Sequence, residues 1–402
     1  MPTSQPTDLI ITNIRPHGGG ETSITVKSGR ITAIGGPAEP GLKVFDGHGL
    51  LAIPGLVEAH AHLDKTLYGM PWYVNKVGPA LLDKIDNERA MKRALGIDAH
   101  RQSARQVALT VGHGTTHIRT HVDVDTECGV TSIEGVMATK AAHADHVDMQ
   151  IVAFPQSGLL RRPGTLELMD TAMRLGADAV GGIDPCSMDR DPKGHLDAVF
   201  GLAQRHGKGV DIHLHEPGEM GAFSMDLIIE RAKALGMRGQ SVVISHAFCL
   251  GMPDVAAVDR LLADLAAAEI AIMTLGTPSR PVPPLLRARA AGVVVGTGSD
   301  GIRDTWGPYG DADILERAMI LGMRNNLRHD TEVEQALDVC THGGAKMMGL
   351  TDYGIAVGKS ADLVLLPGSC LTEAVVSRPV DRITFKRGRI TARNGAAAFQ
   401  VP

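Results

Sequence analysis

The chain has 402 residues, of which 44% are hydrophobic and 21% are charged, and its formal net charge is -5. These values are ordinary for a globular protein with a sizeable core, and a net negative charge argues against a nucleic-acid-binding surface. Aromatic residues make up only 3% of the chain, so stacked aromatic platforms for single-stranded bases are not expected.

No segment of the sequence has the pattern of a leader or a membrane anchor. The first eight residues contain neither a basic segment nor an apolar core, and no later apolar run is long enough to cross a bilayer. The five cysteines are scattered without a C-x-x-C pair, so neither disulfides nor a thiolate zinc site is indicated. We therefore expect a cytoplasmic protein with reduced thiols and no membrane partner.

Short β segments occur at both ends of the chain. Five of them lie between Gly-rich turns, at residues 8–14, 23–27, 30–34, 358–366 and 380–390. Strands at the two termini need partners, and they can supply them to each other. We therefore expect one small β-sandwich domain built from residues 1–55 together with residues 352–402.

The region between these ends alternates apolar runs with helical patterns, as β/α units do. The apolar runs are residues 51–60, 115–122, 149–155, 179–184, 209–214, 241–246, 269–275 and 292–298. Eight runs predict an α/β fold with a (β/α)8 TIM-like barrel over residues 56–351 as the catalytic domain. A doubly wound open sheet is the alternative, but no G-x-G-x-x-G follows the first run.

The connection after the first strand, residues 64–98, is the longest departure from this alternation. Long connections at the carboxyl end of a barrel strand usually form a lid or a pocket wall. We expect this segment to border the site.

Polar residues at the carboxyl ends of the predicted strands are the candidate site residues, because active sites of such barrels lie there. They are His60, His62, His121, Asp123, Gln156, Asp184, His213, His215, Glu216, His246, Ser299 and Asp300. Six of the 17 histidines of the chain belong to this set. A single histidine is usually an ordinary core or surface residue, but so many polar groups at one barrel mouth are costly without a ligand.

Four of these residues have the chemistry of a metal site. His60 and His62 are one residue apart on a strand, so their rings lie on the same side and both can reach one ion. With His213 and Asp300 they offer three imidazoles and one carboxylate, which suit Zn²⁺ or Fe²⁺ with a position open for water. Such an ion lowers the pKa of its bound water to about 7.

Several motifs resemble those of the amidohydrolase superfamily, and the resemblance spans nearly the whole chain. They are residues 54–62 (Pro-Gly-Leu-Val-Glu-Ala-His-Ala-His), 245–246 (Ser-His), 298–300 (Gly-Ser-Asp) and 353–364. More narrowly, residues 60–65, 119–124, 150–158 and 304–306 resemble the prokaryotic cytosine deaminases and their relatives, which include 5-methylcytosine deaminases and N-substituted ammelide hydrolases. The resemblance implies a barrel with a small β-sandwich, one metal ion and a homo-oligomer.

The resemblance also implies roles for individual residues. The metal ligands would be His60, His62, His213 and Asp300. Glu216 would be the acid/base that serves the ring nitrogen, His246 would contact the metal-bound water, and Gln156 would contact the substrate. Asp300 can also accept the proton of the attacking water.

Two residues near Asp300 bear on the substrate. Gly301 stands where cytosine deaminases of this type have a second aspartate, and we expect the missing side chain to open space for a 5-substituted ring such as 5-methylcytosine. Trp306 is expected either to wall the ring pocket or to pack under a loop. In contrast, residues 180–185, 213–215 and 299–304 resemble the ammelide hydrolases more than the cytosine deaminases.

The leading hypothesis from the sequence is a metal-dependent deaminase that releases ammonia from cytosine or 5-methylcytosine. The alternatives are an N-substituted ammelide (s-triazine) hydrolase that releases an alkylamine, and a non-catalytic binding barrel.

Some roles stay open at this stage, those of Asp64, Lys65, His121, Asp123, Asp184 and His215. Asp64 and Lys65 either orient a metal ligand or have a solvated or ion-paired role at the surface. His121 and Asp123 either pack inside the barrel or support the ligands.

Overall fold

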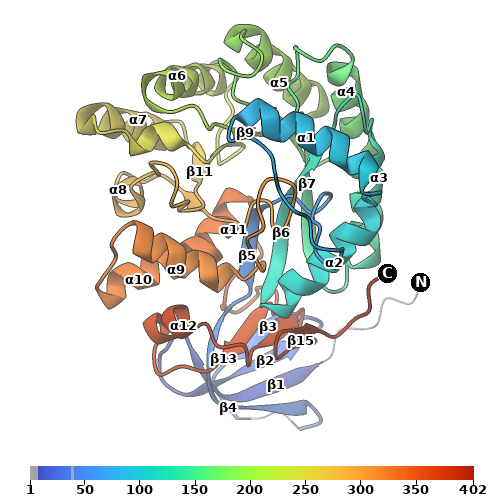
Figure 1. Cartoon of the computed structure of the whole chain (residues 1–402). Coiled ribbons are helices and arrows are strands. Elements are labelled where there is room, and N and C mark those ends of the chain that lie inside the picture. Colours follow the sequence, from blue (N-terminus) through green and yellow to red (C-terminus); the bar gives the residue numbers. More distant parts are fainter. Residues whose placement is uncertain (1–7, 38–39) are drawn as a thin grey trace.

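The computed structural model describes residues 8–37 and 40–402. Residues 1–7, on which the expectation of no leader segment mainly depends, lie outside this part. A barrel of strands surrounded by helices stands on a smaller sheet that contains segments from both ends of the chain (Figure 1). No helix of the described part is both long and apolar enough to cross a membrane.

The barrel consists of eight parallel strands that follow the order of the chain. They are β5 (Leu56–Ala61), β6 (Thr115–Asp123), β7 (Asp148–Phe154), β8 (Ala179–Ile183), β9 (Gly209–His213), β10 (Val242–Ser245), β11 (Ala271–Met273) and β12 (Val295–Gly296). The barrel closes where the amide of Asp300 donates to the carbonyl of His60 at 2.8 Å. A side chain on Gly298 would collide with the backbone of His60 there, so glycine permits the closure. The predicted (β/α)8 barrel is confirmed.

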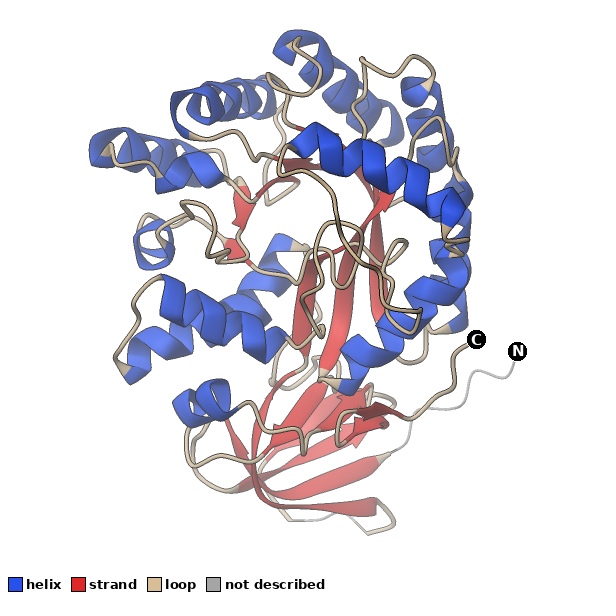
Figure 2. Ribbon diagram, in the orientation of Figure 1, coloured by secondary structure: helices blue, strands red, loops and turns tan. Residues whose placement is uncertain are grey.

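Helices cover the outside of the barrel (Figure 2). They are α1 (Leu81–Ala94), α2 (Ala99–Gly112), α3 (Thr131–Ala142), α4 (Thr165–Leu175), α5 (Pro192–His206), α6 (Gly218–Ala234), α7 (Val255–Ala267), α8 (Leu285–Ala290), α9 (Ile314–Arg324), α10 (Asp330–Asp338) and α11 (Gly344–Met347), with the short turns η1 (Phe248–Gly251) and η2 (Val339–Gly343). Several begin at an aspartate whose carboxylate accepts a free backbone N–H of the first turn, as Asp98 does for α2 and Asp254 for α7.

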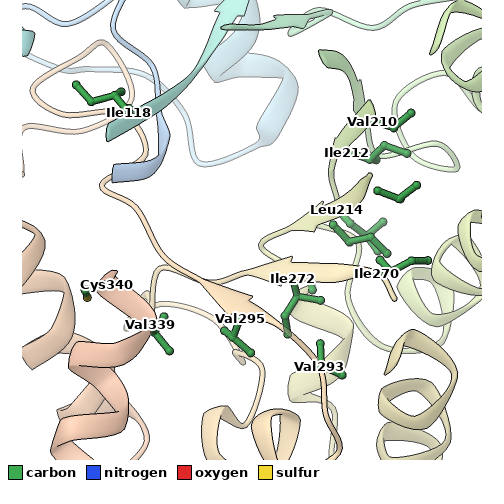
Figure 3. Close-up of a cluster of buried hydrophobic side chains, with 14 of the residues drawn as sticks. Ile118, Val210, Ile212, Leu214, Ile270, Ile272, Val293, Val295, Val339 and Cys340 are labelled. Carbon is green, nitrogen blue, oxygen red and sulfur yellow. The ribbon is translucent and has the colours of Figure 1, made fainter. Parts of the chain in front are cut away.

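The apolar core lies between the strands and the helices. Figure 3 shows Val210 and Ile212 of β9 and Ile272 of β11 in one cluster of hydrophobic side chains, and all three are buried. Because side chains alternate along a strand, their neighbours Asp211 and His213 point into the barrel. The interior of the barrel is therefore polar at β9, which allows a site to be built there.

The smaller sheet combines strands from both ends of the chain. Its strands are β1 (Leu9–Pro16), β2 (Thr22–Lys27), β3 (Arg30–Ile34), β4 (Lys43–Pro54), β13 (Leu363–Leu366), β14 (Ile383–Lys386), β15 (Arg389–Arg393) and β16 (Ala396–Ala397), and α12 (Leu371–Ser377) follows β13. C-terminal β13 pairs with N-terminal β4. The amide of Ile31 on β3 donates to the carbonyl of Lys359 at 2.9 Å, so the sheet curls back on itself. The predicted small β domain formed by both termini is therefore present.

The run predicted as one strand over residues 51–60 is divided in the structure. Its first part belongs to β4 of the small sheet, and β5 of the barrel begins at Leu56. The carbonyl of Gly55, between the two strands, accepts a hydrogen bond from the hydroxyl of Tyr353 at 2.6 Å. The interpretation of residues 51–60 as a single strand was wrong, because an unbroken apolar run does not show where the chain passes from one sheet to the other.

Buried ion pairs join the small sheet to the barrel. Arg382, which is fully buried, donates to both carboxylate oxygens of Asp313, each at 2.7 Å. Lys386 of β14 donates to Asp148 of β7 and to Asp362, also at 2.7 Å. These charges are paired and hydrogen-bonded, so they fix the position of one sheet on the other.

Candidate active site

Four side chains converge at the carboxyl ends of the barrel strands. Ring nitrogens of His60, His62 and His213 and a carboxylate oxygen of Asp300 all lie within 4.8 Å of one another. Nε2 of His62 is 3.0 Å from Oδ1 of Asp300 and 3.4 Å from Nε2 of His213. The structure thus brings together the four residues that the sequence predicted as metal ligands.

The charges of this cluster suit a cation. Burial lowers the pKa of His62, and burial together with the neighbouring rings holds the pKa of His213 well below normal. Burial alone would raise the pKa of Asp300, but the neighbouring rings of His60 and His62 hold it well below its usual range. Metal ions bind neutral imidazoles and ionised carboxylates, and the buried Nε2 of His60 has no hydrogen-bond partner in the described part of the chain. These residues therefore fit one divalent transition-metal ion.

A chain of buried polar groups holds the ring of His60. Ser245 on β10 donates to Oδ1 of Asp211 at 2.7 Å, and its oxygen lies 3.0 Å from Nδ1 of His60. Arg119 donates to the other oxygen of Asp211 at 3.1 Å. Burial alone would raise the pKa of Asp211, but the neighbouring His121 and Arg119 hold it below its usual range. Since the Ser245 hydroxyl is committed to Asp211, its oxygen can accept only from Nδ1–H, which leaves the lone pair of His60 on Nε2.

His121 lies beneath this cluster. Its ring centroid is 4.0 Å from that of His60, and its Nε2 is 3.3 Å from Oδ1 of Asp211. Burial is the main cause that lowers the pKa of His121 to about 3, so the ring is neutral. His121 thus packs inside the barrel, against a ring of the cluster, and its two ring nitrogens have no hydrogen-bond partner in the described part of the chain.

The backbone is strained at several positions of the site. Asp184, His246 and Asp300 are not glycines, yet their φ angles are 38°, 70° and 62°. Such left-handed conformations cost about 1–3 kcal/mol each and persist where the surrounding structure enforces them. Three strained polar residues on three different strand ends are typical of a functional site.

A cavity of about 310 Å³ lies against the cluster. Its walls are formed by His62, Lys65, Gln156, His213, His215, Thr277, Asp300, Gly301, Asp304, Trp306, Gly307 and Tyr309. The three residues predicted to contact the substrate, Gln156, Gly301 and Trp306, are all among them. His246 is buried beside the cavity, with its ring stacked on that of His215 at 4.3 Å between centroids.

Lys65 connects several residues of this wall. Its Nζ donates to Oε1 of Gln156 at 2.8 Å, to Asp123 at 3.0 Å and to Glu88 of α1 at 3.2 Å. The indole N–H of Trp306 donates to the other oxygen of Glu88 at 2.5 Å. The nearby carboxylates, Asp123 foremost, outweigh the effect of burial and raise the pKa of Lys65, so it is a fixed cation.

This arrangement corrects two sequence alternatives. Lys65 and Asp64 are 3% and 1% exposed, so neither lies on the solvated surface. Asp123 forms ion pairs with Lys65 and Lys92 and does not merely pack.

A larger cavity of about 360 Å³ lies beside α1, shares only Gln156 with the first one and is lined by none of the four clustered residues.

Glu216 lies differently from what the sequence resemblance implied, and its neighbour His215, whose role was left open, faces the cavity. The carboxylate of Glu216 accepts from the amide of Ser187 at 2.7 Å and from the hydroxyl of Ser224, and it does not line the cavity. Burial raises its pKa. His215 does line the cavity, and its Nδ1 is 2.8 Å from Oδ2 of Asp184. Burial opposes the charge on His215, but Asp184 outweighs burial and raises the pKa.

The space expected beside Gly301 is not open. A Cβ atom at this position would overlap Oδ2 of Asp304, so the carboxylate of Asp304 fills the room that a side chain would take. The sequence showed the missing side chain but not the direction of Asp304. The expectation of free space next to Asp300 was therefore wrong.

Four cavity residues were not singled out from the sequence as site residues in their own right, namely Asp304, Thr277, Gly307 and Tyr309. Asp304 was quoted only within a motif, and its place four residues after Asp300 in one loop was the available signal. Glu88 was also missed, because it lies on α1, in the segment expected to be an irregular connection. That segment does border the site, as predicted.

A (β/α)8 barrel with three histidines and one aspartate beside a cavity at its strand ends defines the class of metal-binding barrel hydrolases. The chain belongs to the Amidohydrolase family, whose model matches residues 90–398. It is thus a hydrolase of carbon–nitrogen bonds, and the resemblance seen in the sequence is confirmed.

Known proteins resemble the chain over almost its full length. The crystal structure of N-isopropylammelide isopropylaminohydrolase from Burkholderia multivorans ATCC 17616 is 47% identical, with a TM-score of 0.94 over 98% of this chain and 100% of that one. N-isopropylammelide isopropyl amidohydrolase from Pseudomonas sp. (strain ADP) is 30% identical over 87% of this chain and 88% of its own length. A 5-methylcytosine deaminase from Klebsiella pneumoniae, solved with 5-fluorocytosine, is 28% identical, with a TM-score of 0.84 over 98% and 99%.

Proposed function

We propose that this protein hydrolyses the bond between a ring carbon and an exocyclic amine of a nitrogen heterocycle, with an N-alkyl ammelide as its first candidate substrate. The observation that carries the proposal is the cluster of three imidazoles and one carboxylate at the wall of the 310 Å³ cavity. The similarity to two N-isopropylammelide hydrolases, one at 47% identity, supports our choice of the s-triazine over the cytosine ring that the sequence favoured.

His60, His62, His213 and Asp300 would hold the metal ion. A divalent ion bound there would act as a Lewis acid that makes water nucleophilic near neutral pH. His60 is oriented for this by Ser245 and Asp211, as described above.

Asp300 and His246 would serve the attacking water. Asp300 has a second carboxylate oxygen besides the one facing His62, so it can take up a proton of the water. Burial holds the pKa of His246 well below normal, so its neutral ring can donate a hydrogen bond to the oxygen on which charge develops.

A proton must reach the departing amine, and two neighbouring residues are candidates for delivering it. His215 faces the cavity and carries a raised pKa through its contact with Asp184, which makes it a competent acid near neutral pH. Glu216, the donor implied by the sequence resemblance, would first have to leave Ser187 and Ser224. We therefore assign the step to His215 and keep Glu216 as the alternative.

Gln156 would recognise an acceptor on the ring. Lys65 has only donors, so the amide of Gln156 must turn its oxygen towards Lys65 and its NH₂ group towards other partners. A carbonyl oxygen or an unprotonated ring nitrogen of the substrate would accept from that NH₂ group. Trp306, whose indole is held by Glu88, would lie beside the ring.

A cytosine-like ring is the second candidate. It is supported by the similarity to the 5-methylcytosine deaminase, and its carbonyl can also accept from Gln156. It differs from the first candidate in the product, since ammonia rather than an alkylamine is released.

The experiment is a substrate screen with zinc-loaded and iron-loaded enzyme. N-isopropylammelide, N-ethylammelide, cytosine, 5-methylcytosine, isocytosine and creatinine are tested for release of alkylamine or ammonia. Turnover of the ammelides at least tenfold above that of the cytosines supports the proposal, and the reverse order favours the second candidate. Full metal loading without turnover of any ring would instead support a non-catalytic binding barrel.

Two variants separate the candidate proton donors. His215→Asn should lower kcat by about 10²–10⁴-fold while metal content stays near one ion per chain. Glu216→Gln should have a smaller effect if the assignment is right. A larger loss in Glu216→Gln than in His215→Asn would reverse it, and loss of metal from either variant would show that the changed residue supports the metal site.

A further inference from the structure

The carboxylate of Asp304 has an unusual position in the cavity wall. One of its oxygens, Oδ1, accepts from the amides of Trp306 and Gly307 at 2.7 and 3.0 Å. No hydrogen bond to the other oxygen, Oδ2, is found in the described part of the chain. The residue is 8% exposed and lines the same cavity as Lys65, Gln156 and Asp300, so Oδ2 is the atom that remains available there.

Gly301 is explained by this carboxylate. Its φ angle is not in the left-handed region, so the backbone conformation does not require glycine. Any larger residue would place its Cβ atom on Oδ2 of Asp304. Glycine at the residue after Asp300 therefore keeps a place for the Asp304 side chain next to the metal cluster.

Oδ2 is not among the buried atoms that lack a partner, so it is open to the cavity, and a ligand that displaces water from it has to offer a donor in return. Lys65 lies near enough to affect the charge of Asp304, but its Nζ donates to Gln156, Asp123 and Glu88. The protein thus leaves Oδ2 for a donor that enters the cavity. Gln156 offers the opposite chemistry on the same wall, because its free group is an NH₂ donor.

We propose that Asp304 is a specificity-determining residue, whose Oδ2 accepts a hydrogen bond from an N–H of the bound heterocycle in the room left by Gly301. The inference rests on the proposed function insofar as a heterocycle binds in this cavity. Together with Gln156 it defines the ligand class, which is a ring that carries an N–H donor and a carbonyl or ring-nitrogen acceptor on the edges facing these two residues.

The test measures ring binding as well as turnover in the zinc-loaded enzyme. Asp304→Asn keeps an oxygen for the amides of Trp306 and Gly307 but replaces Oδ2 by a donor. In Asp304→Asn, loss of a charge-assisted hydrogen bond should weaken binding of 2,4,6-trihydroxy-s-triazine, the ring product of ammelide hydrolysis, by about 10- to 100-fold. The KM for N-isopropylammelide should rise by a similar factor, with a much smaller change in kcat. Asp311→Asn is the control, because Asp311 accepts from a backbone amide of the same loop and does not line the cavity.

A relocation experiment separates recognition from loop structure. Asp304→Ser retains an oxygen that can bond the loop amides and empties the space beside Gly301. Adding Gly301→Asp to this variant returns a carboxylate to that space from the neighbouring residue. The double variant should bind the ring at least about tenfold more tightly than Asp304→Ser does. A purely structural role of Asp304 would not allow this recovery.

Each outcome bears on the inference. Equal affinity of wild type and Asp304→Asn, an equal loss in Asp311→Asn, or no recovery in the double variant overturns it, and so does a metal-loaded wild type that binds no heterocycle. If the wild type binds the ring but turns over no substrate, the proposed function fails. The binding comparison of Asp304→Asn then still decides the role of Asp304.

Discussion

Ser245→Ala should weaken the metal site without removing a ligand. The hydroxyl of Ser245 lies 3.0 Å from Nδ1 of His60 and donates to Asp211 at 2.7 Å. Alanine removes the acceptor that holds the proton on Nδ1, so the ring can rotate or carry its proton on Nε2, where it cannot bind metal. Loss of such a supporting group typically lowers metal affinity by 10- to 100-fold, which corresponds to about 1.4–2.7 kcal/mol.

The assay is competition for zinc between the apo-enzyme and a chromophoric chelator at pH 7.5. Ser103→Ala serves as the matched control, because Ser103 on α2 is also fully buried and hydrogen-bonded, to Thr139 at 2.6 Å, but does not touch the cluster. Both variants should lose some stability, and only Ser245→Ala should lose zinc affinity. The same zinc affinity in Ser245→Ala and wild type would refute the reasoning. An equal loss of zinc affinity in both variants would mean that the loss comes from general destabilisation of the fold.

Three further predictions concern other parts of the structure. Removal of metal with dipicolinate should abolish turnover, and added Zn²⁺ or Fe²⁺ should restore it. Activity that survives when elemental analysis finds less than about a tenth of an ion per chain would contradict the metal assignment. Arg382→Met should lower the free energy of unfolding by about 3–5 kcal/mol in urea titrations, because Asp313 then stays buried without its partner; a change below about 1 kcal/mol would contradict it. Burial raises the pKa of Glu58 from 4.5 to about 7, so the folded chain holds this proton more tightly and stability falls as pH rises between these values. This decline in the free energy of unfolding amounts to at most about 3 kcal/mol between pH 5 and 8 in the apo-enzyme, and Glu58→Gln should remove it. Parallel pH curves for wild type and variant would exclude this role of Glu58.

The barrel and the metal cluster could be predicted because both depend on simple periodicities. Eight apolar runs separated by helical patterns indicate the number of strands, and the polar residues after them fall at one rim of the barrel independently of how the side chains pack. His60 on β5 and His62 just after its end lie on the same side because side chains alternate along an extended chain. For these features the order of the residues is nearly sufficient.

The contacts around the cavity could not be predicted in the same way. Glu88 on α1 contacts Lys65 and Trp306, which are 23 and 218 residues away from it along the chain, and no spacing rule links them. The direction of the Asp304 side chain depends on the turn that its Oδ1 stabilises. Likewise, which of His215 and Glu216 faces the cavity depends on how the chain leaves β9, after the regular alternation of the strand has ended.

The pairing of β4 with β13 has a consequence for how the chain folds during synthesis. Residues 51–54 lie directly before the strand of His60 and His62, yet their partners are residues 363–366, some 300 positions later. While the ribosome is still producing the barrel, this side of β4 has no neighbour and resembles an exposed edge strand that can pair with another chain. Closing so long a loop is also slow. Final docking of the small sheet therefore comes last, and nascent chains that stall between β12 and β13 should be the form most dependent on chaperones.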